Sequence, residues 1–392
     1  MTTVRRKTED GITKQGSGYI ARIELPRDPI TGERRQGWYG PYRTRKIAQR
    51  ERRKLLSNLD EGTFVEPSDQ TTARFLVDWL EAIEPTVRPS TLHSYRRNLR
   101  LHVIEHIGTV PLQRLDPVGL NALYARLLAE GNRDHPGGLS PKTVHYVHVI
   151  LNRALKDAVR WGRLPRNPAE LADPPRLSAS SRPEIQAWPA EVLAEFLSRS
   201  KEYGDRYYPF WVVTATTGAR RGEILGLRWS DVDLGAGRAA IRQTVIAVHH
   251  DVRFGQPKTV KGRRSLSLDP ATVAVLKTWR RQQREEKMLL GPGYRDHDLV
   301  FCKVTGEPLH PERVSREFDR RVERWELPRI TLHGLRHSWA TLALARGVHP
   351  KVVQERLGHS TVSTTIDLYS HTTRTLHDEA ANLVANEIFG VH

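Results

Sequence analysis

The sequence predicts a multidomain protein: a small α+β N-terminal module, an all-α middle domain, and a mainly α C-terminal domain with a small antiparallel β-sheet. The length of 392 residues suggests two or three domains. Apolar residues recur with helical spacing from residue 71 to about residue 170. Alternation with a period of two, which indicates strands, is confined to short stretches near residue 20 and between residues 238 and 268.

The chain is strongly basic, and its charge is unevenly distributed. Its 62 Lys and Arg residues outnumber 45 Asp and Glu residues, which gives a formal net charge of +17. Residues 1–55 alone hold fifteen basic and six acidic residues. This balance is typical of a protein with a polyanionic partner, most often a nucleic acid. The alternative is a generally basic composition, as in proteins of GC-rich genomes, without a special partner.

Cysteine usage and hydropathy exclude several classes of protein. Cys302 is the single cysteine, so an intramolecular disulfide framework and any site with several cysteine ligands are excluded. The same usage indicates a reducing, intracellular compartment. No stretch approaches the roughly 18 consecutive apolar residues of a membrane helix, and residues 1–18 lack the apolar core of a secretory signal. We therefore expect a soluble protein with no membrane partner.

The first predicted domain is the basic module of residues 1–65. Residues 18–25 alternate between apolar and polar side chains and predict a strand. Asp-Pro and Thr-Gly turn signals separate it from a second short strand through Trp38 and Tyr39, and a basic helix follows over residues 43–59. A small Arg-rich sheet with one helix is suited to reading DNA. The alternative is a basic tail that only adds phosphate contacts.

The second predicted domain, residues 70–172, is a compact bundle of at least four helices. Two of its helices begin with a capping residue followed by proline, at Asp116-Pro117 and Ser140-Pro141. Helical spacing predicts the following inward-facing residues: Phe75, Leu76, Trp79, Leu80, Ile83, Leu92, Tyr95, Leu99, Leu120, Leu123, Tyr124, Leu127, Leu128, Val144, Val147, Leu151 and Ala158. Asp-Pro-Pro and Ser-Ala-Ser-Ser in residues 173–186 predict an interdomain linker, and residues 187–392 form the third domain.

The first chemical motif of the third domain is Thr-Gly-Ala-Arg-Arg-Gly-Glu over residues 217–223. Arg220 opens a predicted helix beside free backbone amides, which is a suitable arrangement for binding an anion. Glu223 lies three residues further on and can face back to orient Arg220. Taken alone, an Arg–Glu pair at this spacing is usually a surface pair.

The second motif surrounds Lys258, in Pro-Lys-Thr, and is followed by Gly-Arg-Arg over residues 262–264 and an alternating stretch over residues 265–268. The pattern predicts a β-hairpin with Lys258 near its tip, where the amine could enter an active site as a proton donor. The alternative is a solvated turn lysine. Lys261, Arg263 and Arg264 are further cations of the same region, although the Pro-Lys-Thr context favours Lys258.

The third motif places His333 and Arg336 three residues apart, so that one helix face presents both. A titratable imidazole beside a permanent cation suits a negatively charged reacting group. His333 and His337 also have the spacing of a zinc-binding helix. Zinc is disfavoured, because Gly334 stands where the metalloprotease motif has its glutamate.

The fourth motif is Leu-Gly-His, which ends at His359, with Tyr369 and His371 downstream. A tyrosine can act as a nucleophile and form a covalent intermediate if its phenolate is stabilised. An isolated tyrosine is more often a half-buried core residue.

In order, the four motifs resemble the signature of the tyrosine recombinases, the phage integrase family. The resemblance covers residues 185–375 directly and implies the tyrosine recombinase fold for the C-terminal domain. The upstream bundle looks like that family's core-binding, SAM-like domain. The basic N-terminal module looks like the arm-type DNA-binding domain of the longer, phage-type integrases.

The resemblance implies a role for each motif residue. Arg220 and Arg336 would bind the non-bridging oxygens of the scissile phosphate and oppose the charge of the transition state. Tyr369 would attack phosphorus and form a 3′-phosphotyrosyl link with a free 5′-hydroxyl. Lys258 would protonate that leaving oxygen.

The remaining roles complete the implied site without a metal or any other cofactor. His333 would accept a proton and contact the phosphate, and His359 would be a further donor to the phosphate. Glu223 would hold Arg220 and the histidine in place. Because the covalent link conserves the energy of the phosphodiester, no ATP is needed, and the sequence has no Gly-rich phosphate loop.

The implied function is site-specific integration and excision of a mobile element such as a prophage. The implied partners are double-stranded DNA attachment sites of core and arm type, other copies of the chain in a homotetramer, an excisionase and a host DNA-bending protein. The implied location is the bacterial cytoplasm, at the nucleoid. Alternatives are a resolvase or invertase of the same family, a type IB topoisomerase, and a non-catalytic DNA-binding recombination factor. An amphipathic helix expected over residues 378–389 would dock on its own domain or on a neighbouring subunit.

Overall fold

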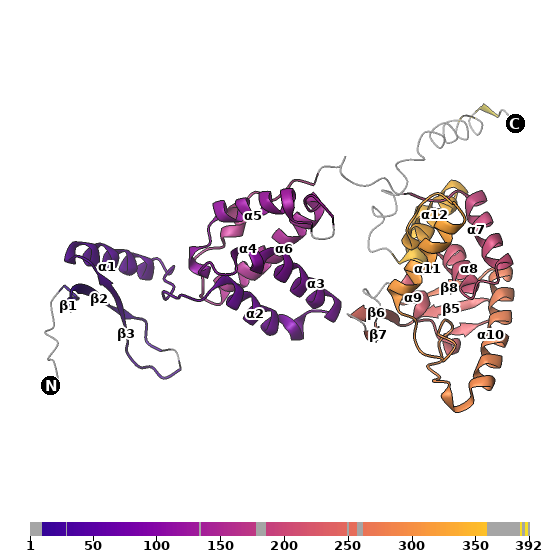
Figure 1. Ribbon diagram of the computed structural model, residues 1–392, viewed down its shortest axis with the longest axis horizontal. Helices are drawn as coiled ribbons and strands as arrows, with labels where there is room; N and C mark the ends of the chain where they lie inside the picture. Colours follow the sequence, from indigo (N-terminus) through magenta and orange to yellow (C-terminus); the bar gives the residue numbers. More distant parts are fainter. Residues whose placement is uncertain are drawn as a thin grey trace. The chain divides into compact units, whose positions relative to one another are not determined.

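The computed structural model describes residues 10–28, 30–132, 135–177, 186–248, 251–256, 262–358, 385 and 389–390 (Figure 1). The chain divides into two compact units, residues 1–181 and residues 182–392. The division falls within the segment where the sequence predicts a linker. The C-terminal helix expected over residues 378–389 lies almost entirely outside the described residues.

The N-terminal module is a three-stranded antiparallel sheet with one helix packed on it (Figure 1). Its elements are β1 (Ile12–Gln15), β2 (Gly18–Leu25), β3 (Arg35–Tyr42) and α1 (Arg45–Asp60), with the strands in the order β1-β2-β3. α1 covers the face that carries Ile12 and Ala21, and its own Ala48 is buried there. The helix begins after Thr44, whose hydroxyl accepts a hydrogen bond from the N–H of Ile47 at 3.3 Å. The sequence pattern did not predict β1, because four residues are too few for a clear alternation.

The helical bundle follows in the same unit. Its helices are α2 (Thr72–Ile83), α3 (Pro89–Leu99), α4 (Glu105–Ile107), α5 (Pro117–Glu130) and α6 (Pro141–Arg160), with shorter turns η1 (Glu84–Thr86), η2 (Arg100–Ile104), η3 (Leu112–Arg114) and η4 (Pro168–Leu171). The predicted caps are present: Asp116 accepts from the N–H of Gly119 at 2.7 Å, and Ser140 from the N–H of Thr143 at 3.2 Å. The predicted core residues are buried with one exception. Leu128 is 38% exposed, because the buried stripe of α5 ends at Leu127.

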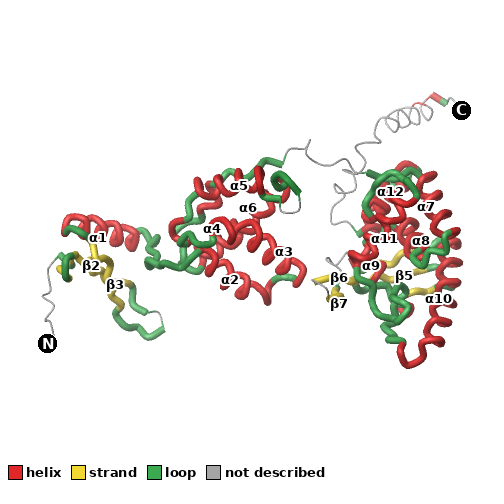
Figure 2. The backbone as a smooth tube through the Cα atoms, in the orientation of Figure 1, coloured by secondary structure: helices red, strands yellow, loops and turns green. Residues whose placement is uncertain are grey.

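The second unit is mainly helical, with two small antiparallel sheets (Figure 2). Its helices are α7 (Ala190–Glu202), α8 (Tyr208–Thr217), α9 (Arg221–Leu225), α10 (Pro270–Leu290), α11 (Pro311–Arg324), α12 (Leu332–Ala345) and α13 (Pro350–Leu357), with turns η6 (Trp229–Asp231) and η8 (Gly291–Gly293). Its strands are β4 (Val232–Asp233), β5 (Arg238–Ile241), β6 (Thr244–Val248), β7 (Asp251–Gly255) and β8 (Arg264–Ser267). α8 is buried over most of its length and packs against α7, α10 and α12.

The prediction of a β-hairpin with Lys258 near its tip is wrong, because the strands before and after Lys258 do not pair with each other. The hairpin is formed by β6 and β7, which end before Lys258, whereas β8 pairs with β5 in a separate sheet of order β4-β5-β8. β8 joins β5 because this pairing buries Leu266 beside Ala239 in the main core. Lys258 belongs to the connection between the two sheets, and residues 257–261 lie outside the described part of the chain.

Within the described residues, no helix is both long and apolar enough to cross a membrane.

Candidate active site

The first motif forms the corner between α8 and α9. α8 ends at Thr217, and Gly218 continues the chain with φ +63°, in the left-handed region that favours glycine. A Cβ atom on Gly218 would lie 2.7 Å from Cδ2 of Leu357, so glycine also permits the close approach of α13. Arg220 then stands at the N-cap of α9, with 37% of its side chain exposed.

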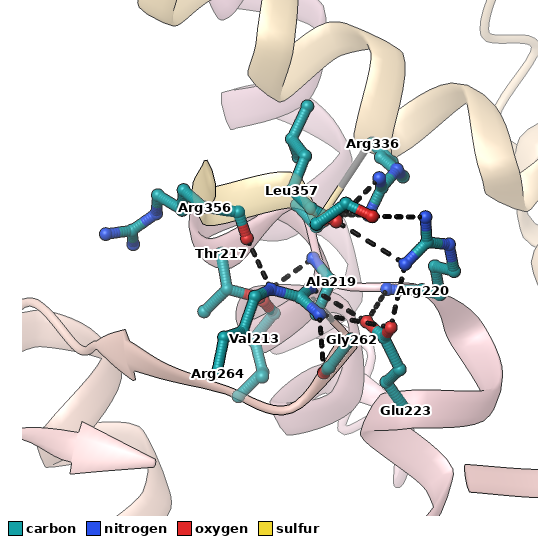
Figure 3. A network of polar contacts seen from close by, with 12 residues as sticks. Val213, Thr217, Ala219, Arg220, Glu223, Gly262, Arg264, Arg336, Arg356 and Leu357 are labelled. Atoms are coloured by element: carbon teal, nitrogen blue, oxygen red, sulfur yellow. Dashed lines mark hydrogen bonds and ion pairs between the residues drawn. The ribbon is translucent and has the colours of Figure 1, made fainter. Parts of the chain in front are cut away.

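The carboxylate of Glu223 is buried and fully hydrogen-bonded (Figure 3). It accepts from the backbone N–H and Nη1 of Arg220, both at 2.9 Å, and from Nη1 and Nη2 of Arg264 at 3.1 and 2.8 Å. Burial by itself favours the protonated carboxyl, but the hydrogen bonds and charges of Arg264 and Arg220 outweigh it and lower the pKa of Glu223. These four donors occupy the four lone-pair positions of a carboxylate. The resemblance implies that Glu223 holds Arg220 and a histidine. In the structure the second partner of the Glu223 side chain is Arg264.

Arg264 also belongs to this cluster. The sequence analysis considered it only as an alternative to Lys258 for the role of proton donor. Its side chain is 8% exposed, and its Nε donates to the carbonyl of Arg356 at 2.6 Å. Its position could have been found from the alternation, because Arg264 shares a strand face with the buried Leu266. A guanidinium that is always charged and held in this way does not serve as the proton donor.

Arg336 lies on α12 and is almost completely buried, with 2% exposure. Its Nη1 donates to the carbonyl of Gly218 at 2.9 Å, and its Nη2 donates to the carbonyl of Leu357 at 2.8 Å. Burial, followed by the nearby charge of Arg220, lowers the pKa of Arg336 to about 9. The side chain therefore remains charged near neutral pH, and its charge is poorly compensated inside the protein.

The C-terminal end of α13 connects the three arginines (Figure 3). The carbonyl of Arg356 accepts from Arg264, and that of Leu357 accepts from Arg336 and, at 3.5 Å, from Arg220. The carbonyl of Gly358 accepts from Nη2 of Arg220 at 2.9 Å. The last carbonyls of a helix lack partners within the helix and carry its negative dipole end. They therefore bring three guanidinium groups together beside a single carboxylate, Glu223.

His333 lies on the same helix as Arg336. It keeps solvent access, yet crowding by protein atoms, followed by the influence of His337 and Arg336, lowers its pKa to about 4. The imidazole is therefore neutral near pH 7. The rings of His333 and His337 meet edge to face, with centroids 4.8 Å apart. Within the described residues, no group of three or more His, Cys, Asp or Glu side chains could hold a metal ion.

The structure thus brings Arg220 and Glu223, at the start of α9, together with Arg336 of α12, and His333 lies one turn before Arg336. The other three predicted site residues, Lys258, His359 and Tyr369, lie outside the described residues.

The cluster is able to bind an anion. Among the described residues, the edge of Arg220 formed by Nε and the second Nη2 hydrogen has no hydrogen-bond acceptor. Such an edge presents two parallel N–H groups, the geometry that suits two oxygens of a phosphate. The excess of positive charge over Glu223 favours a negatively charged group at this place.

Two family models match the chain. The model described as the phage integrase family matches residues 190–375, and the one described as the phage integrase N-terminal SAM-like domain matches residues 71–128. The chain belongs to the phage integrase family of tyrosine recombinases. These enzymes cleave and rejoin DNA through a phosphotyrosine intermediate, and this recombinase is an enzyme of that class.

Relatives of similar length support the family. A protein named tyrosine recombinase XerC-like, from Caldanaerobacter subterraneus subsp. tengcongensis, is 25% identical over 370 residues, which cover 90% of this chain and 92% of the relative. An integrase from Streptomyces ambofaciens is 29% identical over 362 residues, which cover 90% of this chain and 88% of the relative.

Solved structures confirm the fold. The Tn1549 transposon integrase in complex with transposon right end DNA has a TM-score of 0.66 at 21% identity, over 80% of this chain and 100% of that chain. A lambda integrase tetramer bound to a Holliday junction has a TM-score of 0.56 at 18% identity, over 93% of this chain and 96% of that chain. The recombinase therefore has the tyrosine recombinase fold with a SAM-like domain, mainly helical with small antiparallel sheets.

Proposed function

We propose that this recombinase integrates and excises a mobile element, such as a prophage, at double-stranded DNA attachment sites. The observation that carries the proposal is the convergence of Arg220 and Arg336, 116 residues apart, on one carbonyl of Leu357. Two guanidinium groups from separate helices suit the two non-bridging oxygens of a scissile phosphate, and their charge would oppose the charge that develops in the transition state.

The remaining chemistry is assigned from the motifs. Tyr369 would attack phosphorus, so that the bond to the 5′ oxygen breaks and a 3′-phosphotyrosyl link forms. Lys258 would give a proton to the leaving 5′ oxygen, and His359 would donate a hydrogen bond to the phosphate. His333 would accept the proton of the tyrosine hydroxyl, which its neutral form near pH 7 allows. Rejoining would reverse these steps with a new 5′-hydroxyl.

The test of this assignment is the substitution Tyr369→Phe. It should abolish the covalent protein–DNA product on a nicked suicide substrate and leave DNA binding intact, because it removes one hydroxyl and no phosphate contact. Band shifts on the same duplex measure binding, and denaturing gels measure the adduct. A covalent adduct formed by Tyr369→Phe would show that another residue is the nucleophile.

The proposed reaction uses no metal. Arg220, Arg336 and Lys258 would supply the positive charge that magnesium supplies in nucleases. Strand cleavage by the full chain should therefore proceed at an unchanged rate in excess EDTA. A strict requirement for a divalent cation would contradict this mechanism.

The N-terminal module, residues 1–65, is proposed to bind separate arm-type DNA sites. The sheet face opposite α1 carries Arg22 and Trp38, which stand opposite each other in register, with the guanidinium carbon 5.9 Å from the ring centroid. Trp38 is 43% exposed, so this face presents a cation and a ring to a partner. The bundle of residues 70–172 would bind the core site, residues 173–186 would link it to the third domain, and residues 187–392 would carry the chemistry.

Removal of residues 1–65 should spare binding to the core site and abolish binding to distal arm-type sites. The single substitution Trp38→Ala should weaken arm binding in the same direction while it keeps the basic charge of the module. Equal losses on both DNAs would mean that the module is only an electrostatic tail.

Four copies of the chain are proposed to assemble on DNA, as in the lambda integrase tetramer bound to a Holliday junction. Residues after about 375 would dock on a neighbouring subunit and link four protomers, with an excisionase and a host DNA-bending protein as accessory factors in the bacterial nucleoid. Truncation after residue 375 should damage synapsis far more than single-site binding. Normal recombination by the truncated chain would contradict docking between subunits.

A further inference from the structure

Arg264 connects separate parts of the candidate active site, and only 8% of its side chain is exposed. It is the first residue of β8, directly after the connection that contains Lys258. Its guanidinium bonds Glu223 of α9 and the carbonyl of Arg356 in α13 (Figure 3). Two helices that the proposed reaction needs, α9 and α13, therefore meet at one side chain of β8.

The hydrogen bonds of Arg264 use most of its donors inside the protein. Nη1 and Nη2 donate to the two oxygens of Glu223, Nη1 also donates to the carbonyl of Gly262 at 3.3 Å, and Nε donates to Arg356. Each of the three nitrogens of the guanidinium therefore already has an acceptor inside the protein, and 8% of the side chain is exposed. Arg264 differs in this respect from Arg220, whose Nε has no acceptor among the described residues and whose side chain is 37% exposed.

Two routes lead from Arg264 to the arginines that would bind the phosphate. Along the first, Arg264 fixes both oxygens of Glu223, and the same two oxygens accept from Nη1 and the backbone N–H of Arg220. Along the second, Arg264 fixes the carbonyl of Arg356, and the next two carbonyls of α13 accept from Arg336 and Arg220. A shift of Arg264 would thus change the direction of both guanidinium groups.

We propose that Arg264 is a positioning residue for DNA cleavage, which sets the orientation of Arg220 and Arg336 through Glu223 and the end of α13. This inference rests on the proposed cleavage reaction. Lysine does not replace arginine here, because a single ammonium group does not span both oxygens of Glu223 and a carbonyl on α13 with the planar fork of a guanidinium.

The experiment compares single-turnover cleavage of a nicked suicide substrate at saturating full-length protein with the Kd for the same duplex. Misplacement of catalytic groups by about 1 Å costs on the order of 10²-fold in rate. Arg264→Met should slow cleavage by about this factor, and Arg264→Lys by about tenfold, since it keeps the charge but loses the fork. The Kd of both variants should stay within about threefold of the wild type, because Arg264 does not reach the DNA.

A matched control is available on the neighbouring strand. Arg238 stands on β5, pairs in register with Ser267 of β8 and is exposed. Arg238→Met removes the same side chain from the same sheet without touching Glu223 or α13. It should leave the saturating cleavage rate unchanged.

A double-mutant cycle separates positioning from a merely structural role. If Arg264 acts through Glu223, then Arg264→Met added to Glu223→Gln should slow cleavage by less than about threefold more. Independent, multiplying losses would contradict the inference. If circular dichroism shows that Arg264→Met does not fold, Arg264→Lys provides the test. A slower saturating rate with an unchanged Kd in that variant supports positioning, and an unchanged rate contradicts it.

The outcomes are distinguishable from failure of the proposed function. If the wild type forms no covalent adduct, the cleavage assignment itself is wrong. If the wild type forms the adduct and Arg264→Lys cleaves at the wild-type rate, only the positioning role is wrong. A loss of affinity with an unchanged saturating rate would likewise overturn it.

Discussion

The helical bundle and the recombinase domain bury different kinds of side chain. The core of the bundle is built from apolar residues such as Trp79, Leu127 and Leu151, all with 0% exposure. The recombinase domain has an apolar core of its own, but beside it Glu223 and Arg336 are also buried, at 3% and 2% exposure. The bundle thus gains stability from burial, whereas the domain buries charges that reduce this gain.

The buried charges are useful for another reason. At the arginine cluster, the lowered pKa of Arg336 means that the protein itself disfavours the charged form of this side chain. A bound phosphate would relieve this penalty, because it supplies the missing negative charge. The cluster of Arg220, Glu223 and Arg336 is therefore arranged for an anion, while the bundle core is arranged for the folded state alone.

The largest expected effect separates activity from stability. Arg336→Met should lower the single-turnover cleavage rate by about 10²–10³-fold, since it removes a positive charge proposed to stabilise the transition state. The urea midpoint of unfolding should change little, because two lost hydrogen bonds are offset by the relief of a crowded buried charge. Denaturation and cleavage are measured on the same preparation. A fall in the midpoint as large as that of a core cavity would contradict the comparison.

The opposite result is expected in the bundle. Leu151→Ala leaves a cavity in a fully buried site and should cost about 2–5 kcal/mol in the free energy of unfolding. The saturating cleavage rate of the folded protein should stay close to that of the wild type, because Leu151 belongs to the core of the bundle, in the other compact unit. Urea unfolding and single-turnover cleavage check the two parts. A proportionate loss of cleavage in fully folded protein would show that the two regions are coupled.

The smallest expected effect is a pH dependence of stability. The pKa of His333 is about 4 in the folded protein against an ordinary value of 6.5, so the unfolded chain binds this proton more readily. The free energy of unfolding should therefore fall as the pH decreases from about 6.5 towards about 4. His333→Gln should make this slope shallower, whereas His297→Gln, at an exposed position of the same domain, should not. Equal slopes in all three proteins would show that His333 is not shifted.

Sequence patterns predicted the bundle well because its rules are local. The caps at Asp116 and Ser140 act within three residues, and helical spacing selects the buried face. The exception, Leu128, marks the edge of a stripe, which periodicity does not locate sharply. In the recombinase domain, spacing alone paired Arg220 with Glu223 correctly, because those two residues lie on one turn.

The sequence by itself determined the order of the motifs, the helices that carry Arg220, His333 and Arg336, and the family to which they belong. Only the tertiary structure decided which strands pair around Lys258 and that Arg264, 41 residues from Glu223, completes its hydrogen bonds. It also decided that the end of α13 joins three arginines. The physical reason is that these contacts depend on where backbone carbonyls and a buried carboxylate point after the helices pack. The spacing of residues along the chain does not show where these carbonyl and carboxylate groups point.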